Sequence, residues 1–370
     1  MGKRELVLIA LFAIIGVVLY HLTAPPPPPG SQGFSAGGIV QSFRRGLAGN
    51  RASVRVDTSR IEAIDPAVEE LRFTLPGTEL TVIGEERADI AVQLGVTSNG
   101  YDDAEARRLA DASALVVTRA ASTLVFAMNF PHEGRQTARL NLKVPKRLKM
   151  RLDQMGGGKL EVSNLSGLEV IGMAGDMSVK NISGPVVLNQ RRGSLEVDGA
   201  MSLKLTSRGD AKAEHVNGTI TVQALGGELT LASVVGPVEI EARNTELKME
   251  SLTDLKAPLR IDANNGSLRI EGLRTEARID GRDTELDVAF DTPVATTIYS
   301  TGDDIGITPP AAGYSLDAVA TDGRITIDDD GIKPTGSESE QRAKGTVRGG
   351  GPTITLRATR ADINVRARPK

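Results

Sequence analysis

The residues of this chain that most resemble a chemical site are the run Gly156-Gly157-Gly158-Lys159. A glycine-rich loop that ends in lysine can hold a phosphate when its backbone N–H groups point inward and a helix follows it. Here Leu160 stands where such a loop needs Ser or Thr, and the next residues alternate as in a strand. The run therefore predicts a turn, and it predicts no nucleotide cofactor.

The three histidines do not have the spacing of a metal site. His21, His132 and His215 are far apart in the chain, whereas metal-binding motifs place their ligands a few residues apart. The chain has no cysteine, which excludes thiolate ligands, disulfides and a lipid-modified N-terminal cysteine. His215 falls in a turn, where we expect a solvated ring.

Two acidic clusters, Asp303-Asp304 and Asp328-Asp329-Asp330, could belong to an enzyme that cleaves glycans with a pair of carboxylates. The chain lacks the repeated Gly-Gly-x-Gly-x-Asp pattern of calcium-binding repeats. Outward positions carry charges of both signs, as at Glu239, Glu241 and Arg243, which is typical of a solvated surface. We therefore assign no catalytic, cofactor-binding or metal-binding residue and expect no enzyme.

The element that would position any site is a repeat of about nine residues between Asp176 and Pro293. Two consecutive units run from Thr219 to Gly227 and from Glu228 to Gly236. Each begins with two aliphatic residues separated by one polar residue, which places both on the same face of a strand. A strand this short cannot bury its apolar face alone, so the units must stack. The repeat predicts a β-solenoid over residues 153–293.

A second rhythm groups these units in pairs. Some units carry a third apolar residue before the turn, such as Ile182, Val216 and Val234, and others have only small or polar residues there. Two units then form one coil of about eighteen residues with two dissimilar faces. No helix is expected in this stretch.

The composition agrees with a narrow aliphatic interior. The chain has 370 residues, 40 glycines and only 3% aromatic residues, and its formal net charge is −3. The glycines are enough for one turn per short strand. Nucleic-acid binding would require a basic face, so we expect no nucleic-acid partner.

The N-terminal part predicts a membrane anchor. Residues 1–5 form a short cytoplasmic tail, and residues 6–22 are an apolar run at the lower length limit for a transmembrane helix. Basic residues precede this run and none follows until Arg44, so the rest of the chain is expected outside the cytoplasm. The alternative is a cleaved signal peptide, which Pro25 disfavours. Residues 23–50, rich in Pro, Gly and Ser, form the linker.

Both ends of the solenoid need a cap, because an open terminal coil exposes unpaired backbone groups. Residues 51–152 predict an N-terminal β cap domain, with a short helix that ends at Ala110 and a hairpin after it. Residues 294–370 predict C-terminal strands and a second cap. Lys333–Lys344 is polar and is expected to be a loop.

Several segments together resemble the DUF4097 family of bacterial β-strand-repeat proteins. The resemblance rests on Leu140–Pro145, on the glycine-punctuated repeat, on Pro309–Ala318 with Asp322–Ile325, and on Gly349–Leu356 with Ala361–Ile363. It implies a right-handed, β-helix-like fold in an adhesin-type envelope protein. It implies no reaction and no catalytic residues.

The sequence thus predicts an all-β, single-stranded β-solenoid with β-rich caps, tethered to the bacterial cytoplasmic membrane by one N-terminal helix. The expected function is a non-enzymatic binding or scaffolding surface in the cell envelope, whose partner is an unknown envelope protein or glycan. An envelope glycan-active enzyme that uses surface carboxylates and an envelope-stress sensor are the alternatives. The oligomeric state is left open.

Overall fold

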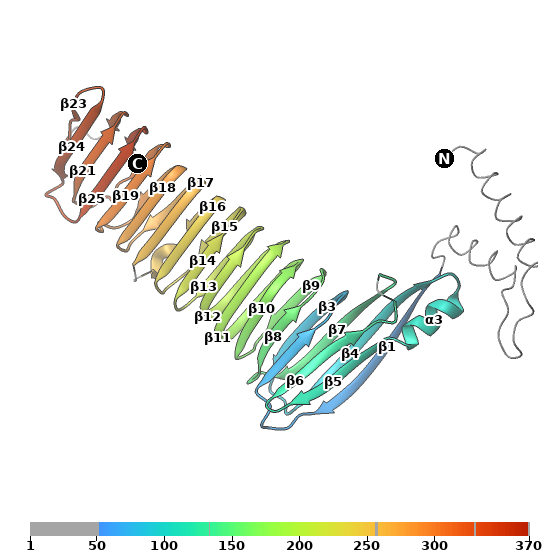
Figure 1. Ribbon diagram of the computed structural model, residues 1–370. Helices are drawn as coiled ribbons and strands as arrows, with labels where there is room; N and C mark the ends of the chain where they lie inside the picture. Colours follow the sequence, from blue (N-terminus) through green and yellow to red (C-terminus); the bar gives the residue numbers. More distant parts are fainter. Residues whose placement is uncertain (1–51, 133, 256–257, 329–330, 369–370) are drawn as a thin grey trace, which may run out of the picture.

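The computed structural model describes residues 52–132, 134–255, 258–328 and 331–368. These residues form a rod of stacked β-coils with one short α-helix at its N-terminal end (Figure 1). The predicted all-β solenoid is confirmed. The expected membrane segment at residues 6–22 lies outside the described residues, and among those described no helix is long and apolar enough to cross a bilayer.

The strands fall into three groups along the rod. The N-terminal group contains β1 (Ala52–Ala63), β2 (Glu70–Thr74), β3 (Thr78–Glu85), β4 (Asp89–Gly100), α3 (Asp103–Asp111), β5 (Ala114–Ala120), β6 (Thr123–Asn129), β7 (Gln136–Pro145), β8 (Lys149–Gln154) and β9 (Lys159–Ser163). The middle group contains β10 (Gly167–Ala174), β11 (Asp176–Arg192), β12 (Leu195–Ser207), β13 (Ala211–Val216), β14 (Ile220–Ala224), β15 (Gly227–Ala232), β16 (Val238–Glu250), η1 (Leu252–Asp254), β17 (Leu259–Leu273) and β18 (Ala277–Phe290). The C-terminal group contains β19 (Thr296–Thr301), β20 (Ile305–Thr308), β21 (Tyr314–Thr321), β22 (Ile325–Ile327), β23 (Thr335–Gly336), β24 (Glu340–Val347), β25 (Thr353–Thr359) and β26 (Ile363–Val365).

The strands stack into two walls, which we call wall A and wall B. Each coil of the middle group contributes one strand segment to each wall. Wall A consists of β5, β6, β2, β8, β10, the second halves of β11 and β12, β14, the first halves of β16 to β18, β19, β25, β21 and β24. Wall B consists of β1, β4, β7, β3, β9, the first halves of β11 and β12, β13, β15, the second halves of β16 to β18, β20, β26 and β22. Asp210 accepts a hydrogen bond from the N–H of Glu228, which lies 18 residues further on. The expected coil of two units is therefore confirmed.

The corners between the walls need unusual backbone geometry. Asn181, Gly199, His215 and Ser233 stand at the ends of four consecutive wall B rungs, and their φ angles of 54°, 81°, 53° and 53° lie in the left-handed region. That region favours glycine and asparagine. In the same connection as Ser233, Gly236 touches the backbone of Gly218 so closely that a Cβ there would lie 2.2 Å from the Gly218 carbonyl oxygen. The coils can therefore pack tightly only with glycine at this corner.

Aliphatic side chains fill the space between the walls. Leu229, Leu231, Leu247 and Met249 are at most 1% exposed, and their registers place them in neighbouring rungs. Each buried aliphatic side chain contributes on the order of 1.5–3 kcal/mol. Aromatic packing occurs at the N-terminal end, where the rings of Phe73 and Phe126 stack with centroids 5.0 Å apart.

The N-terminal cap continues the rod. The coil β2–β3 lies between β6–β7 on its outer side and β8–β9 on its inner side. The hairpin β5–β6 and helix α3, with Asp102 as its N-cap, form as expected. Arg60, paired with Glu62, reaches from edge strand β1 to the Leu115 carbonyl of β5 in the opposite wall. Charges on an edge strand discourage pairing with other chains.

Two expectations about local secondary structure were wrong. Lys333–Lys344 is not a loop, because β23 and β24 form there and β24 pairs antiparallel with β21. Only Ala343 and Val347 of β24 are buried. The sequence of this outermost strand is therefore mostly polar and resembles that of a loop. The stretch expected to lack helix contains η1, a single 3₁₀ turn in the longest coil connection.

The proposed domain limit at residue 152 falls inside β8, which pairs with β2 and β10.

Candidate binding surface

The outer side of wall B carries aligned rows of polar residues at its N-terminal end. β1 and β4 are antiparallel, as are β4 and β7, and β7 continues parallel to β3. Because strand residues alternate between faces, cross-strand partners share one side. The first row is Arg55, Thr97 and Thr137, and the second is Asp57, Gly95, Arg139 and Glu79. Residues distant in the sequence therefore meet on one surface.

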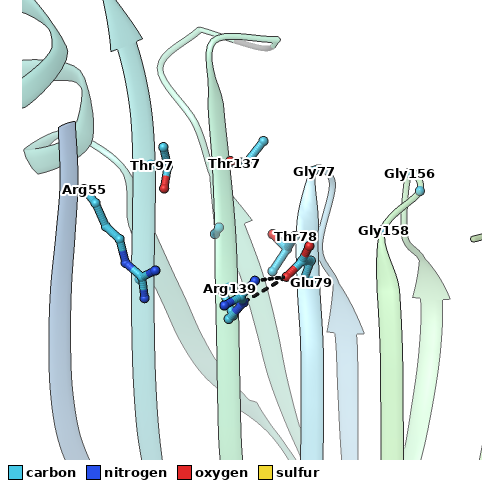
Figure 2. Close-up of a pocket in the computed structure, with 12 residues that line it drawn as sticks. Arg55, Gly77, Thr78, Glu79, Thr97, Thr137, Arg139, Gly156 and Gly158 are labelled. Carbon is cyan, nitrogen blue, oxygen red and sulfur yellow. Dashed lines mark hydrogen bonds and ion pairs between the residues drawn. The ribbon is translucent and has the colours of Figure 1, made fainter. Parts of the chain in front are cut away.

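A hollow of about 370 Å³ lies over these rows (Figure 2). Its lining includes Arg55, Thr97, Thr137, Arg139 and the turn Gly156–Gly158. A second hollow of about 290 Å³ shares Arg55, Gly95 and Arg139 with it. We call the two hollows together the trough. Gly95 carries no side chain at this outward position of β4, and the side chains of Arg55 and Asp57 lie over it: a Cβ there would be 2.5 Å from Asp57 Oδ1 and 3.0 Å from the Arg55 guanidinium.

The charges in the trough form two ion pairs. Arg139 is bound to Glu79 at 2.8 Å, and Arg55 donates to Asp57 at 2.9 Å. All four side chains are about half exposed or more, so each pair contributes at most about 1 kcal/mol to stability. An arginine has five N–H donors, of which a carboxylate occupies only some. The trough can therefore offer guanidinium donors and the hydroxyls of Thr97 and Thr137 to a polar ligand.

The glycine run forms the turn between β8 and β9, as expected. Gly157 and Gly158 have φ angles of 89° and 106°, and Lys159 begins a strand rather than a helix. The Lys159 ammonium lies 2.5 Å from Glu161, and this hydrogen bond raises the pKa of Lys159. The turn also lines the trough, which the sequence did not indicate.

The histidines remain apart in the described part of the chain. His132 is exposed in the loop before β7, and His21 lies outside the described residues. The His215 ring is 65% exposed, and its Nδ1 lies 2.8 Å from an oxygen of Asp198. The solvated ring predicted for His215 is confirmed.

The acidic clusters accept hydrogen bonds from backbone N–H groups in turns. Asp304 accepts the N–H of Asp362 at 2.8 Å, and Asp303 accepts the N–H of Asp304 at 2.9 Å. Asp328 accepts the N–H of Ala367 at 3.1 Å, while Asp329 and Asp330 lie outside the described residues. Among the residues that the structure describes, no three acidic or histidine side chains gather as a metal site would.

Wall A carries a compact ion network near the same end. Asp153 accepts hydrogen bonds from Arg72 and Arg151, and Arg151 also binds Glu169 at 2.8 Å. Burial alone would raise the pKa of Asp153, but the hydrogen bonds from Arg151 and Arg72 outweigh it and hold the pKa below its usual range. This network ties β2, β8 and β10 together.

The residues that line the trough were missed because no local pattern marks them. Arg55 and Arg139 belong to β1 and β7, which meet only through β4. One usable signal was Gly95, which interrupts an alternating strand at an outward position. A glycine there often marks a close approach to the backbone.

The match to a known family covers most of the chain. A model of the Toastrack DUF4097 family matches residues 68–366. The chain belongs to the Toastrack (DUF4097) family. The match begins at Val68, before β2, and ends beyond β26, so it covers this Toastrack solenoid and its caps apart from β1.

Other comparisons add little to this Toastrack assignment. No curated protein matches the chain. One matching structure is that of a candidate cell adhesion protein from Clostridium sporogenes, with 9% sequence identity. The alignment covers 85% of this chain and 100% of the other, with a TM-score of 0.21. A score this low supports no argument about function.

Proposed function

We propose that this protein is a non-enzymatic, adhesin-like binding surface held outside the bacterial cytoplasmic membrane by its N-terminal segment. The apolar run at residues 6–22 and the linker at residues 23–50 support the tether. The partner is an envelope protein or glycan. The observation that carries the proposal is the trough, a polar hollow on a wall of continuous strands.

The trough suits recognition because its frame is rigid. Arg55, Gly95 and Arg139 lie on three adjacent strands, and the residues beneath them, such as Val96 and Leu140, are buried in the core. A preformed polar surface loses little conformational entropy when a ligand binds. The trough also lies near the start of β1, so the tether would leave the folded part beside it.

The carboxylates in the trough argue against glycan cleavage. A glycosidase needs one carboxyl group that carries a proton and one that is ionised. Asp57 and Glu79 are each bound to an arginine, at 2.9 Å and 2.8 Å, so both carboxylates already serve as hydrogen-bond acceptors in ion pairs. We therefore propose binding without reaction. Incubation with isolated envelope glycans should release no new reducing ends, and their release would reject this part of the proposal.

The orientation can be tested in cells of the source bacterium. We expect protease added outside intact spheroplasts to digest an epitope tag placed after residue 370, because the β part is proposed to lie outside. A cytoplasmic protein serves as the control for membrane integrity. Protection of the tag until the membrane is permeabilised would contradict the proposed topology.

A further inference from the structure

The last two strands of the chain do not occupy the last position of the rod. β25 pairs in parallel with β19 on one side and with β21 on the other. Likewise β26 lies between β20 and β22. After β20 the chain therefore skips the space of one coil, builds β21 to β24 beyond it, and returns to fill that space. We call this space the slot.

The two connections that make this detour cross each other. The outgoing connection is Pro309–Gly313 and the returning connection is Arg348–Pro352. The Arg348 guanidinium donates to the carbonyl of Pro310 at 3.0 Å and also to that of Ala311. A Cβ on Gly313 would lie 2.5 Å from the Gly350 carbonyl oxygen. The crossing is therefore tight.

The returning connection has the composition of a hinge. Arg348, Gly349 and Gly350 have φ angles of 51°, 87° and 80°, which reverse the chain sharply. Glycine adopts these angles at little cost, and it adopts an extended conformation as readily. If this connection were extended, β25 would be carried away from its own slot.

The slot is specific for the strands that fill it. Ile354, Leu356 and Ile363 are completely buried there. Arg357 binds the Asp317 carboxylate at 2.9 Å, and Asp362 accepts the N–H of Arg324 at 2.8 Å. These contacts depend on the sequence of β25 and β26. They do not depend on which chain supplies the strands.

We propose that the slot is an interaction site for a second copy of this chain. In this arrangement β25 and β26 of one copy fill the slot of the other, and the exchange is reciprocal. All core contacts and ladder hydrogen bonds are kept, and only the connection at Arg348–Pro352 changes. Exchange of an identical element at a short hinge is a low-cost route to a dimer.

The absence of native cysteine allows a direct test in the full chain. Thr297 of β19 and Thr355 of β25 are directly paired and partly exposed on wall A. We would introduce Thr297→Cys and Thr355→Cys, with and without the hinge substitutions Gly349→Val and Gly350→Val. Valine disfavours positive φ, so the hinge variant should extend the connection. The cross-link should form within one chain in the first protein and between chains in the second.

A second pair of cysteines serves as the control, because it joins two strands that a change at this hinge cannot exchange. Thr221→Cys and Glu239→Cys lie opposite each other on β14 and β16 of the same wall. This pair should cross-link within one chain in both backgrounds. If the hinge variant also keeps the Thr297→Cys to Thr355→Cys link within one chain and stays monomeric, the proposal is overturned.

A second measurement decides the matter if the hinge variant fails to fold. The Thr297→Cys/Thr355→Cys protein would be unfolded and refolded at low and at high concentration. Links between chains should be rare at low concentration and become the main product at high concentration. Links that stay within one chain at every concentration would overturn the proposal.

Discussion

Replacement of Gly236 by alanine should separate two coils in the middle of the rod. The φ angle of Gly236 is not in the left-handed region, so alanine can adopt its conformation. The obstacle is the neighbouring coil, because the new Cβ would lie 2.2 Å from the Gly218 oxygen and 2.4 Å from the Gly218 carbonyl carbon. Both atoms are backbone, so no side chain can move aside.

The cost follows from the hydrogen bonds beside this contact. The coils would have to separate locally by about 1 Å to restore a normal contact. The bonds from Ile220 N to Pro237 O (2.9 Å) and from Val235 N to Val216 O (3.1 Å) flank the site. Both would then exceed the usual hydrogen-bond length. The loss of these two bonds, at roughly 1 kcal/mol each, predicts a destabilisation of about 2 kcal/mol.

The assay is denaturant unfolding of the purified chain, followed by far-UV circular dichroism. Gly156→Ala is the matched control, because a Cβ on Gly156 meets no atom within 4 Å. The control should keep or slightly raise stability, by up to about 1 kcal/mol. If Gly236→Ala stays within about 0.5 kcal/mol of wild type, or if both variants lose the same stability, the account of tightly stacked coils is refuted.

Three further substitutions test the core, a buried amide and the ion network. Leu231→Ala should lower the free energy of unfolding by about 2–5 kcal/mol in the same assay, because the side chain is fully buried. Gln136→Leu should raise it by about 1 kcal/mol, since both amide atoms are buried without a hydrogen-bond partner among the described residues; a loss would contradict this. Asp153→Asn should destabilise the protein near neutral pH but not in acid. Arg151 and Arg72 hold the pKa of Asp153 below 3.8, so its stabilisation is complete above pH 3.8 and disappears as the pH falls through the folded-state pKa. Thermal melts of both proteins between neutral and strongly acidic pH would show a constant difference if this reasoning fails.

The rungs of the rod were predictable because their signal is local. Leu229 and Leu231 lie two residues apart, and this spacing alone places both on one face of a strand. The turn at Gly236 closes the unit in the same local way. Some units carry a third apolar residue before the turn, such as Val234, and others do not. This difference indicated that two units form one coil with two walls.

The order of the strands at the ends was not predictable, because pairing partners are not local. Ile354, Leu356 and Ala358 alternate like any other rung, and nothing in the sequence places them between β19 and β21. The trough depends on the same kind of information. Arg55 and Arg139 come to the same surface, in neighbouring rows, only because β4 lies between their strands.

The central claim is that the trough is where this protein binds its partner. A photo-cross-linking amino acid in place of Thr137, in intact cells, tests it most directly, with the same amino acid in place of Thr221 on wall A as the control. Both positions are exposed on a strand. We predict a defined cross-linked species at position 137 only, which Arg139→Ala weakens. The same products at both positions, or none at position 137, would contradict the claim.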